Sequence, residues 1–172
     1  MMKGWVVLIT LFTLVAVSFT AGTVLAQGRK QEVRENMCQR VKDRIEDRRE
    51  RFQEHRDQRV NIYRGVIQRL NNLVTKLEDR GCDAGQVKTD ISTFESLVDE
   101  LVATFNLFID KLQAVGVPVC QEDPGDWKTA MAQVREQLQA VKAKHQEIRS
   151  FYKETLKPDV KAAGQACRTT NE

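Results

Sequence analysis

Glycine and proline are scarce in this sequence, which holds nine glycines and three prolines among its 172 residues. Most of those within residues 27–172 gather at three places, 81–85, 116–125 and 158–164. The segments between these breaks consist of helix-forming residues with helical periodicity, and none alternates as a strand would. The scarcity therefore argues against a compact α/β fold and indicates an all-α protein.

Residues that carry catalytic or metal-binding chemistry are also few. The chain has two histidines and few serines, and it lacks a Gly-x-Ser-x-Gly elbow, a glycine-rich phosphate loop, Cys-x-x-Cys spacing and Glu-x-x-His pairs. His145 falls at a packed helix position, level with Leu70 by counting, and about 20 Å along the axis from His55. We therefore predict no enzyme activity, no cofactor and no metal site.

Apolar residues recur at alternating four- and three-residue steps in two long stretches. The first is Val87, Ile91, Phe94, Val98, Leu101, Phe105, Phe108, Leu112 and Val115, and the second is Trp127, Met131, Val134, Leu138, Val141, His145, Ile148 and Tyr152. This spacing gives each helix a narrow seam that only a neighbouring helix can bury. Both segments are therefore predicted to pack like coiled coils.

Three helices are predicted, at about 30–80, 84–115 and 124–157, with a partly helical tail at 158–172. Short connections make neighbouring helices antiparallel, so we expect an elongated up-down-up three-helix bundle. Counting from the first turn, the long first helix overhangs the bundle by about 18 residues, or about 27 Å.

Residues that typically begin or end helices support these boundaries. Gly81 is expected to cap the first helix in the left-handed conformation. Asp83 and Gln86 have the spacing of a capping box at the start of the second helix. Pro124 suits the first position of the third helix, and Pro158 is expected to kink or end it.

The N-terminal segment has the pattern of an export signal. Lys3 is the only charge in the first 28 residues, residues 4–17 are almost wholly apolar, and a Val-Leu-Ala sequence ends at Ala26. We predict a signal peptide at 1–26, cleaved to leave 27–172 as one domain that is periplasmic, on the cell surface or secreted. The alternative is a retained single-pass anchor, since 23 apolar and small residues are enough to span a bilayer.

Four cysteines permit three pairings, and export places them where disulfides persist. A bridge from Cys82 to Cys38 would span the first helix, about 65 Å, and one from Cys82 to Cys120 would span the second, about 50 Å. Bridged Cα atoms lie within about 7 Å. The sequence therefore predicts Cys38–Cys120 at one end of the bundle and Cys82–Cys167 at the other.

Charge is unevenly distributed, with a net +4 in residues 29–64, −6 in 65–126 and +4 in 127–172. An acidic helix between two basic ones suits packing against both, and no specific nucleic-acid partner is predicted because such surfaces carry one sign. In the Arg-rich run, residues 40–64, arginines alternate with carboxylates at helical spacing. This favours a self-paired, solvated helix, and weak adhesion to polyanions or anionic membrane surfaces is the alternative.

Val33, Met37, Val41 and Ile45 form an apolar stripe on the overhanging part of the first helix. Little of the predicted core reaches this stripe, although a loop at 117–119 is placed to cover its nearer part. The uncovered part needs a helix from a second copy or from another protein. We predict a homodimer or partner site there, and a membrane contact only if the N-terminal segment is retained.

Together these features favour an exported, non-enzymatic protein of the cell envelope or extracellular space that acts as a structural or protein-interaction module. In outline the chain resembles small helical periplasmic chaperones, which combine an export signal with helical hairpins rich in Arg and Gln. It lacks the Leu-Thr-x-x-Gln motifs of the best-known group, so the resemblance assigns no site residue. A chaperone-like role and a membrane-anchored coiled-coil spacer stand as alternatives.

Overall fold

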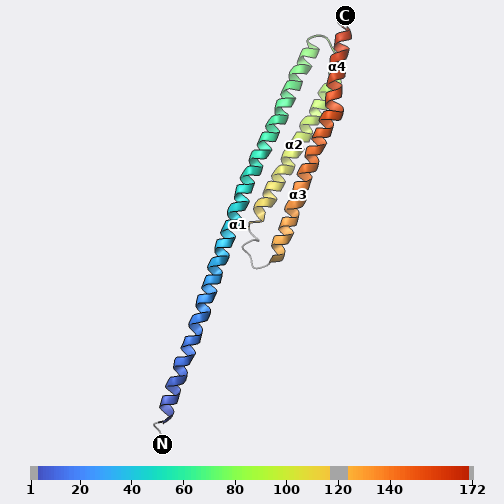
Figure 1. The fold of residues 1–172 in the computed structure, drawn as a ribbon. Helices are drawn as coiled ribbons and strands as arrows, with labels where there is room; N and C mark the ends of the chain where they lie inside the picture. The colour runs from blue at the N-terminus through green and yellow to red at the C-terminus, as the bar shows by residue number, and fades with distance from the viewer. Residues whose placement is uncertain (1–3, 117–123, 171–172) are drawn as a thin grey trace. The chain divides into compact units, whose positions relative to one another are not determined.

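The structure is a computed structural model that describes the backbone of residues 4–116 and 124–170, and the side chains of 32–33, 35–116 and 127–169. Within these residues every regular element is a helix and none is a strand, which confirms the all-α class. The elements are α1 (Gly4–Glu78), α2 (Gly85–Ala114), α3 (Pro124–Phe151), the π-helix η2 (Tyr152–Leu156) and α4 (Lys157–Thr170) (Figure 1).

The chain divides into two compact units, Met1–Asp43 and Arg44–Glu172, and their boundary falls inside α1. The first unit is, in its described part, a single helical segment. The second unit contains the bundle. The expected overhang of the first helix concerns the relation between the two units and stays a prediction.

In the second unit, the α1 segment 44–78 runs antiparallel to α2 (Figure 1). Phe52, early in this segment, packs edge-on against Phe108, late in α2, with ring centroids 4.8 Å apart. Glu78, the last residue of α1, forms an ion pair with Lys88 near the start of α2. Positions that rise along α1 therefore fall along α2.

The continuous α3–η2–α4 segment runs antiparallel to α2 in turn. Lys144 in α3 donates to Glu100 in α2 over 2.7 Å. Farther along, Cys167 in α4 is joined to Cys82, which precedes α2. The up-down-up order expected from the short connections is present in the second unit.

The predicted seam of α2 lines the core of this unit. All of its positions are buried except Phe105, which is half-buried. Leu101 and Phe94, near the middle of the helix, are 0% and 1% exposed. Other helices of this unit also contribute buried apolar residues, among them Val60, Val74 and Leu77 in α1 and Val134, Val141 and Ile148 in α3. The 4–3 spacing therefore identifies the packed face of α2.

The turn after α1 has the cap that Gly81 predicts. Gly81 adopts a φ of 75°. Its N–H donates to the Glu78 carbonyl over 2.8 Å, and the Cys82 N–H donates to the Leu77 carbonyl over 2.9 Å. This pair of hydrogen bonds is the Schellman motif, which satisfies carbonyls at the end of the helix.

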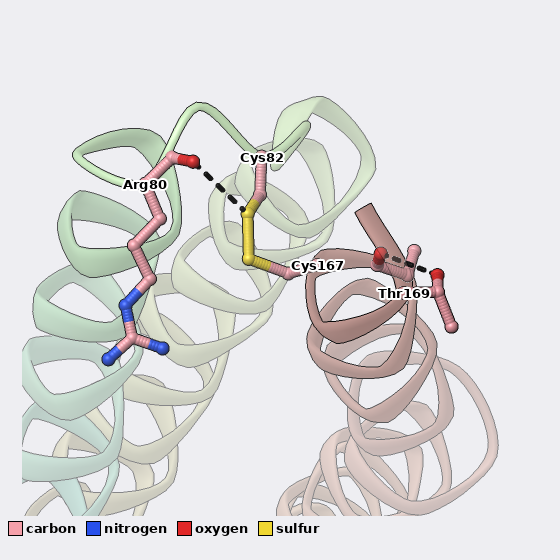
Figure 2. Close-up of a disulfide and its surroundings, with 5 residues drawn as sticks. Arg80, Cys82, Cys167 and Thr169 are labelled. Carbon is pink, nitrogen blue, oxygen red and sulfur yellow. Dashed lines mark hydrogen bonds between the residues drawn. A yellow bond between two sulfur atoms is a disulfide. The ribbon is translucent and has the colours of Figure 1, made fainter. Parts of the chain in front are cut away.

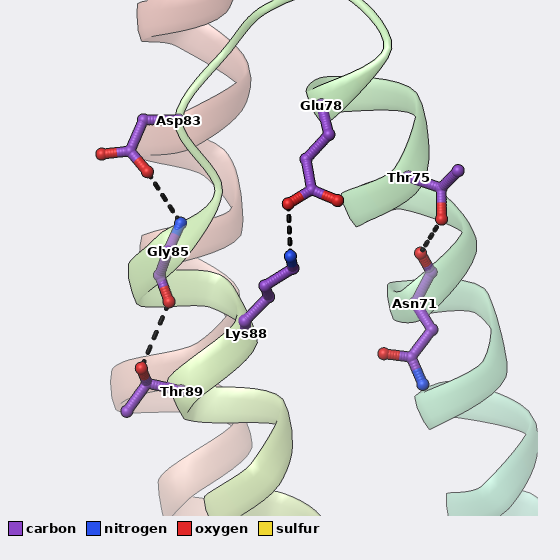
Figure 3. A network of polar contacts seen from close by, with 7 residues as sticks. All are labelled: Asn71, Thr75, Glu78, Asp83, Gly85, Lys88 and Thr89. Atoms are coloured by element: carbon purple, nitrogen blue, oxygen red, sulfur yellow. Dashed lines mark hydrogen bonds and ion pairs between the residues drawn. The ribbon is translucent and has the colours of Figure 1, made fainter.

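The start of α2 differs from the predicted capping box. The Asp83 carboxylate accepts a hydrogen bond from the Gly85 N–H over 2.8 Å (Figure 3), so it does cap the backbone. Gln86, however, donates its side-chain amide to Asp90 Oδ1 over 2.9 Å. Asp90 is buried and one turn away, and a buried carboxylate needs a donor more than the exposed turn does. The capping-box prediction for Gln86 is therefore wrong.

Pro158 neither ends nor breaks the helix, and the expected partly helical tail is instead α4, which continues to Thr170. Proline lacks an N–H, and its ring collides with the carbonyl one turn earlier. Here the preceding turn is widened into η2, in which the Lys157 N–H donates to the carbonyl of Tyr152 five residues back. The wider turn accommodates the ring.

The π-turn also shifts the packed face of the helix. Tyr152, predicted to lie in the seam, is 37% exposed, and Leu156 is fully buried. An i→i+5 turn adds one residue to the helical repeat, so the residues that follow face a different direction. The seam of α3 therefore holds up to Ile148 and is then displaced.

The Cys82–Cys167 disulfide confirms one of the two predicted bridges (Figure 2). Its Cα atoms are 5.3 Å apart, and the Cys82 sulfur lies 3.8 Å from the Arg80 carbonyl oxygen. No cysteine within the described ranges is free. Cys120 lies outside the described residues, so its pairing with Cys38 stays a prediction.

Candidate functional site

An open groove in the second unit brings together side chains from three helices. It encloses about 550 Å³, which falls within the range of roughly 300–1,000 Å³ for ligand sites. Its lining residues are Phe52, His55 and Arg59 from α1, Phe105 from α2, and Leu138, Gln139, Val141, Lys142, His145 and Gln146 from α3. The groove is thus lined jointly by the three helices of the bundle.

Helical spacing explains why these residues share a surface. Phe52, His55 and Arg59 are three and four positions apart, and such residues lie above one another on one face of a helix. Leu138 and Lys142 have the same relation on α3. Each helix therefore contributes one contiguous strip of side chains to the groove.

The apolar lining is more deeply placed than the polar lining. Val141 is buried, and Phe52, Phe105 and Leu138 are half-buried. Most of the polar lining residues are instead exposed, namely His55, Arg59, Gln139, Lys142 and Gln146. The groove therefore has an apolar floor and a polar rim.

The rim carries positive charge, because the lining residues include Arg59 and Lys142 but no carboxylate. Within the part of the chain that the structure describes, neither Arg59 nor Lys142 forms an ion pair. Nearby Lys144, in contrast, is paired with both Glu100 and Glu147 at 2.7 Å. Two cations on the rim are therefore left without a protein counter-charge.

Tyr63 and His145 form a polar pair at one side of the groove. Tyr63 Oη and His145 Nδ1 share a hydrogen bond of 2.8 Å. Burial lowers the pKa of His145, and the charges of Arg59 and Arg149 lower it further. Burial also raises the pKa of Tyr63, against an opposing effect of the same two arginines. Both side chains are therefore mainly neutral at pH 7.

A neutral Tyr63–His145 pair is suited to packing. A tyrosine hydroxyl becomes a strong nucleophile or base when its pKa falls toward the working pH, and here the pKa of Tyr63 rises. The hydrogen bond instead satisfies the half-buried imidazole, as expected for a histidine at a seam position.

The groove corrects the predicted separation of the two histidines. His55 and His145 line the same surface, whereas counting places them about 20 Å apart along the helix axis. Counting takes the register from positions along the chain alone, but the Tyr63–His145 hydrogen bond fixes it in the structure. His145 is consequently level with Tyr63, one heptad closer to His55 than Leu70 is.

The predicted partner stripe divides into exposed and buried parts. Val33 and Met37 are 57% and 64% exposed, Val41 is half-buried, and Ile45 is 9% exposed. The exposed part of the stripe is therefore its N-terminal half, in the first unit.

The Arg-rich run is partly self-paired, as its charge pattern predicts. Arg49 forms an ion pair with Glu46 one turn away, and Arg56 forms one with Asp57 at 2.9 Å. Arg56 also donates to Asn106 in α2 over 2.6 Å. The run thus contributes to packing between helices as well as to the solvated surface.

Asp90 is a buried carboxyl group that the sequence pattern does not reveal. It is 4% exposed, and its Oδ2 atom has no hydrogen-bond partner among the described residues. Burial raises the pKa of Asp90, the Gln86 hydrogen bond lowers it, and nearby Asp159 in α4 raises it again. Only its i+4 distance from Gln86 hints at this role in the sequence.

We expect Asp90→Asn to stabilise the protein at pH 7 by about 1–2 kcal/mol, the cost of a buried unsatisfied group. Because its folded-state pKa is raised, Asp90 favours folding most at pH below its ordinary value of 3.8. That contribution is lost as the pH rises through the folded-state pKa.

Thermal unfolding between pH 3 and 8 should show a smaller decline in stability with rising pH for Asp90→Asn than for the parent. Asp99→Asn, at an exposed position of the same helix, should leave the decline unchanged, and a parallel curve for both variants would contradict the assignment.

Within the described side chains, no three His, Cys, Asp or Glu residues are grouped so that they would hold a metal ion. Among the described residues, no helix has the length and apolarity needed to cross a membrane. The side chains of residues 1–31 lie outside that set, so the signal peptide and its alternative, a retained anchor, stay predictions.

Comparisons of this chain with protein-family models, with curated proteins and with solved structures find no match.

Proposed function

We propose that this protein is an exported, non-enzymatic helical-bundle protein that acts as a structural or protein-interaction module in the cell envelope or extracellular space. The Cys82–Cys167 disulfide supports export, because bridges of this kind persist in oxidising compartments and are rare in the cytosol. The Cys38–Cys120 bridge and cleavage after Ala26 belong to the same proposal. Intact mass of the native protein separates it from the anchored spacer, since cleavage gives a chain that begins at Gln27.

The observation that carries the interaction role is the exposure of Val33 and Met37. Large apolar side chains at the corresponding spacing in α2 are buried against neighbouring helices, whereas these two are more than half exposed. A strip of this kind on one helix face is typically covered by a second helix. We propose that the same strip of a second copy covers it, because two identical strips satisfy each other around a two-fold axis.

Met37→Glu should weaken this self-association at least about tenfold, because it places a charge in the apolar contact. Asn36→Glu adds the same charge at the neighbouring exposed position and should have little effect. The measurement is the solution mass of the native protein by sedimentation equilibrium, together with a form that lacks residues 27–37. If the native and the shortened proteins are both monomeric and equally stable, the stripe is not an interaction site.

A further inference from the structure

We propose that the groove between α1, α2 and α3 binds a single-chain amphiphile with a carboxylate head, that is, a medium- or long-chain fatty acid anion. Two properties of the groove point to such a ligand, namely an apolar floor and a cationic rim that has no carboxylate of its own. The site lies wholly within the second unit. The inference is therefore independent of the proposed self-association through Val33 and Met37.

The head group is the part that the rim selects. Arg59 on α1 and Lys142 on α3 both line the groove, and neither has an ion-pair partner among the residues with described side chains. A guanidinium can bind a carboxylate through two parallel hydrogen bonds, and an ammonium adds a point charge. A single carboxylate between these two side chains would neutralise charge that the protein leaves uncompensated.

The tail is the part that the floor selects. The floor is formed by apolar side chains from all three helices, namely Phe52, Phe105, Leu138 and Val141. These side chains are less exposed than most of the polar lining residues, so the deeper part of the groove is apolar. Covering that surface with an alkyl chain removes apolar area from water on both the ligand and the protein, which favours binding. The volume of about 550 Å³ is of the size that one small ligand occupies.

A polyanion fits these observations less well than a ligand with one charged end. Binding along a polymer of phosphates needs positive charge of one sign along an extended face. Here Glu46 and Asp57 are paired with arginines on the same helix, so carboxylates interrupt the positive charge along α1. The structure therefore favours one anionic head above one apolar tail.

The test is titration calorimetry of the native protein with laurate below its micelle concentration. We expect one saturable site for each chain, with dodecanol, which lacks the charge, and butyrate, which lacks the tail, binding at least about tenfold more weakly. Arg59→Gln combined with Lys142→Gln should weaken laurate binding by a similar factor. Lys76→Gln combined with Lys128→Gln removes the same charge from the same two helices outside the groove, and it should change binding less than about twofold.

Both double variants change exposed residues, and circular dichroism should show each to be as helical as the parent. The proposal is overturned if laurate shows no saturable binding, or if dodecanol binds as tightly as laurate. It is also overturned if the two double variants weaken binding equally, since the effect would then be one of overall surface charge.

Discussion

Leu101→Asp is expected to destabilise the bundle by roughly 4 kcal/mol, enough to lower its melting temperature by more than about 10 °C. Leu101 is 0% exposed, at the middle of the buried α2 seam. A carboxylate there loses its hydration without gaining a partner, and the apolar contacts of the leucine are lost as well. Thermal unfolding followed by circular dichroism at 222 nm measures the effect.

Leu107→Asp is the matched control, because it introduces the same charge into the same helix. Leu107 is 46% exposed, so the new carboxylate can stay hydrated, and the change should cost less than about 1 kcal/mol. Equal losses for the two variants would mean that helix propensity, rather than burial, sets the effect. An unchanged melting temperature for Leu101→Asp would refute the assignment of the packed face.

The second large effect is expected from the double change Cys82→Ser and Cys167→Ser. The two cysteines are 85 positions apart. In the chain-entropy model, closing a loop of this length lowers the entropy of the unfolded chain and so stabilises the folded protein by roughly 4–5 kcal/mol. Urea denaturation of the double variant under oxidising conditions should show a loss of this size. Changing both residues avoids leaving one unpaired thiol.

Reductant provides the control for this measurement. If Cys38 and Cys120 form the second bridge, reducing the double variant should cost additional stability. A double variant as stable as the parent would show that Cys82–Cys167 contributes no net stability.

The packing of α2 was predictable because the spacing of its apolar residues is local and repeated along the helix. Each seam residue from Val87 to Val115 occupies a position fixed by helical periodicity, and all but Phe105 are buried. Gly81 was predictable for a similar reason, since a left-handed cap favours one residue type. Distances along helices also sufficed to identify the Cys82–Cys167 pairing.

The groove was not predictable, because it depends on the register between helices that are distant in sequence. Pro158 indicates a helix break to any local rule, and the π-turn that accommodates it is set by how the whole segment packs. The structure also places His145 beside Tyr63 rather than level with Leu70, a difference of one heptad on α1. Without this shift, the residues of α1 and α3 that line the groove are not expected to meet.

The position of the disulfide has a consequence for an encounter with proteases. In the sequence, α2, α3 and most of α4 lie between the two bridged cysteines. One backbone cut anywhere between these cysteines produces two fragments that are still covalently joined, so neither can diffuse away and the break leaves no loose part.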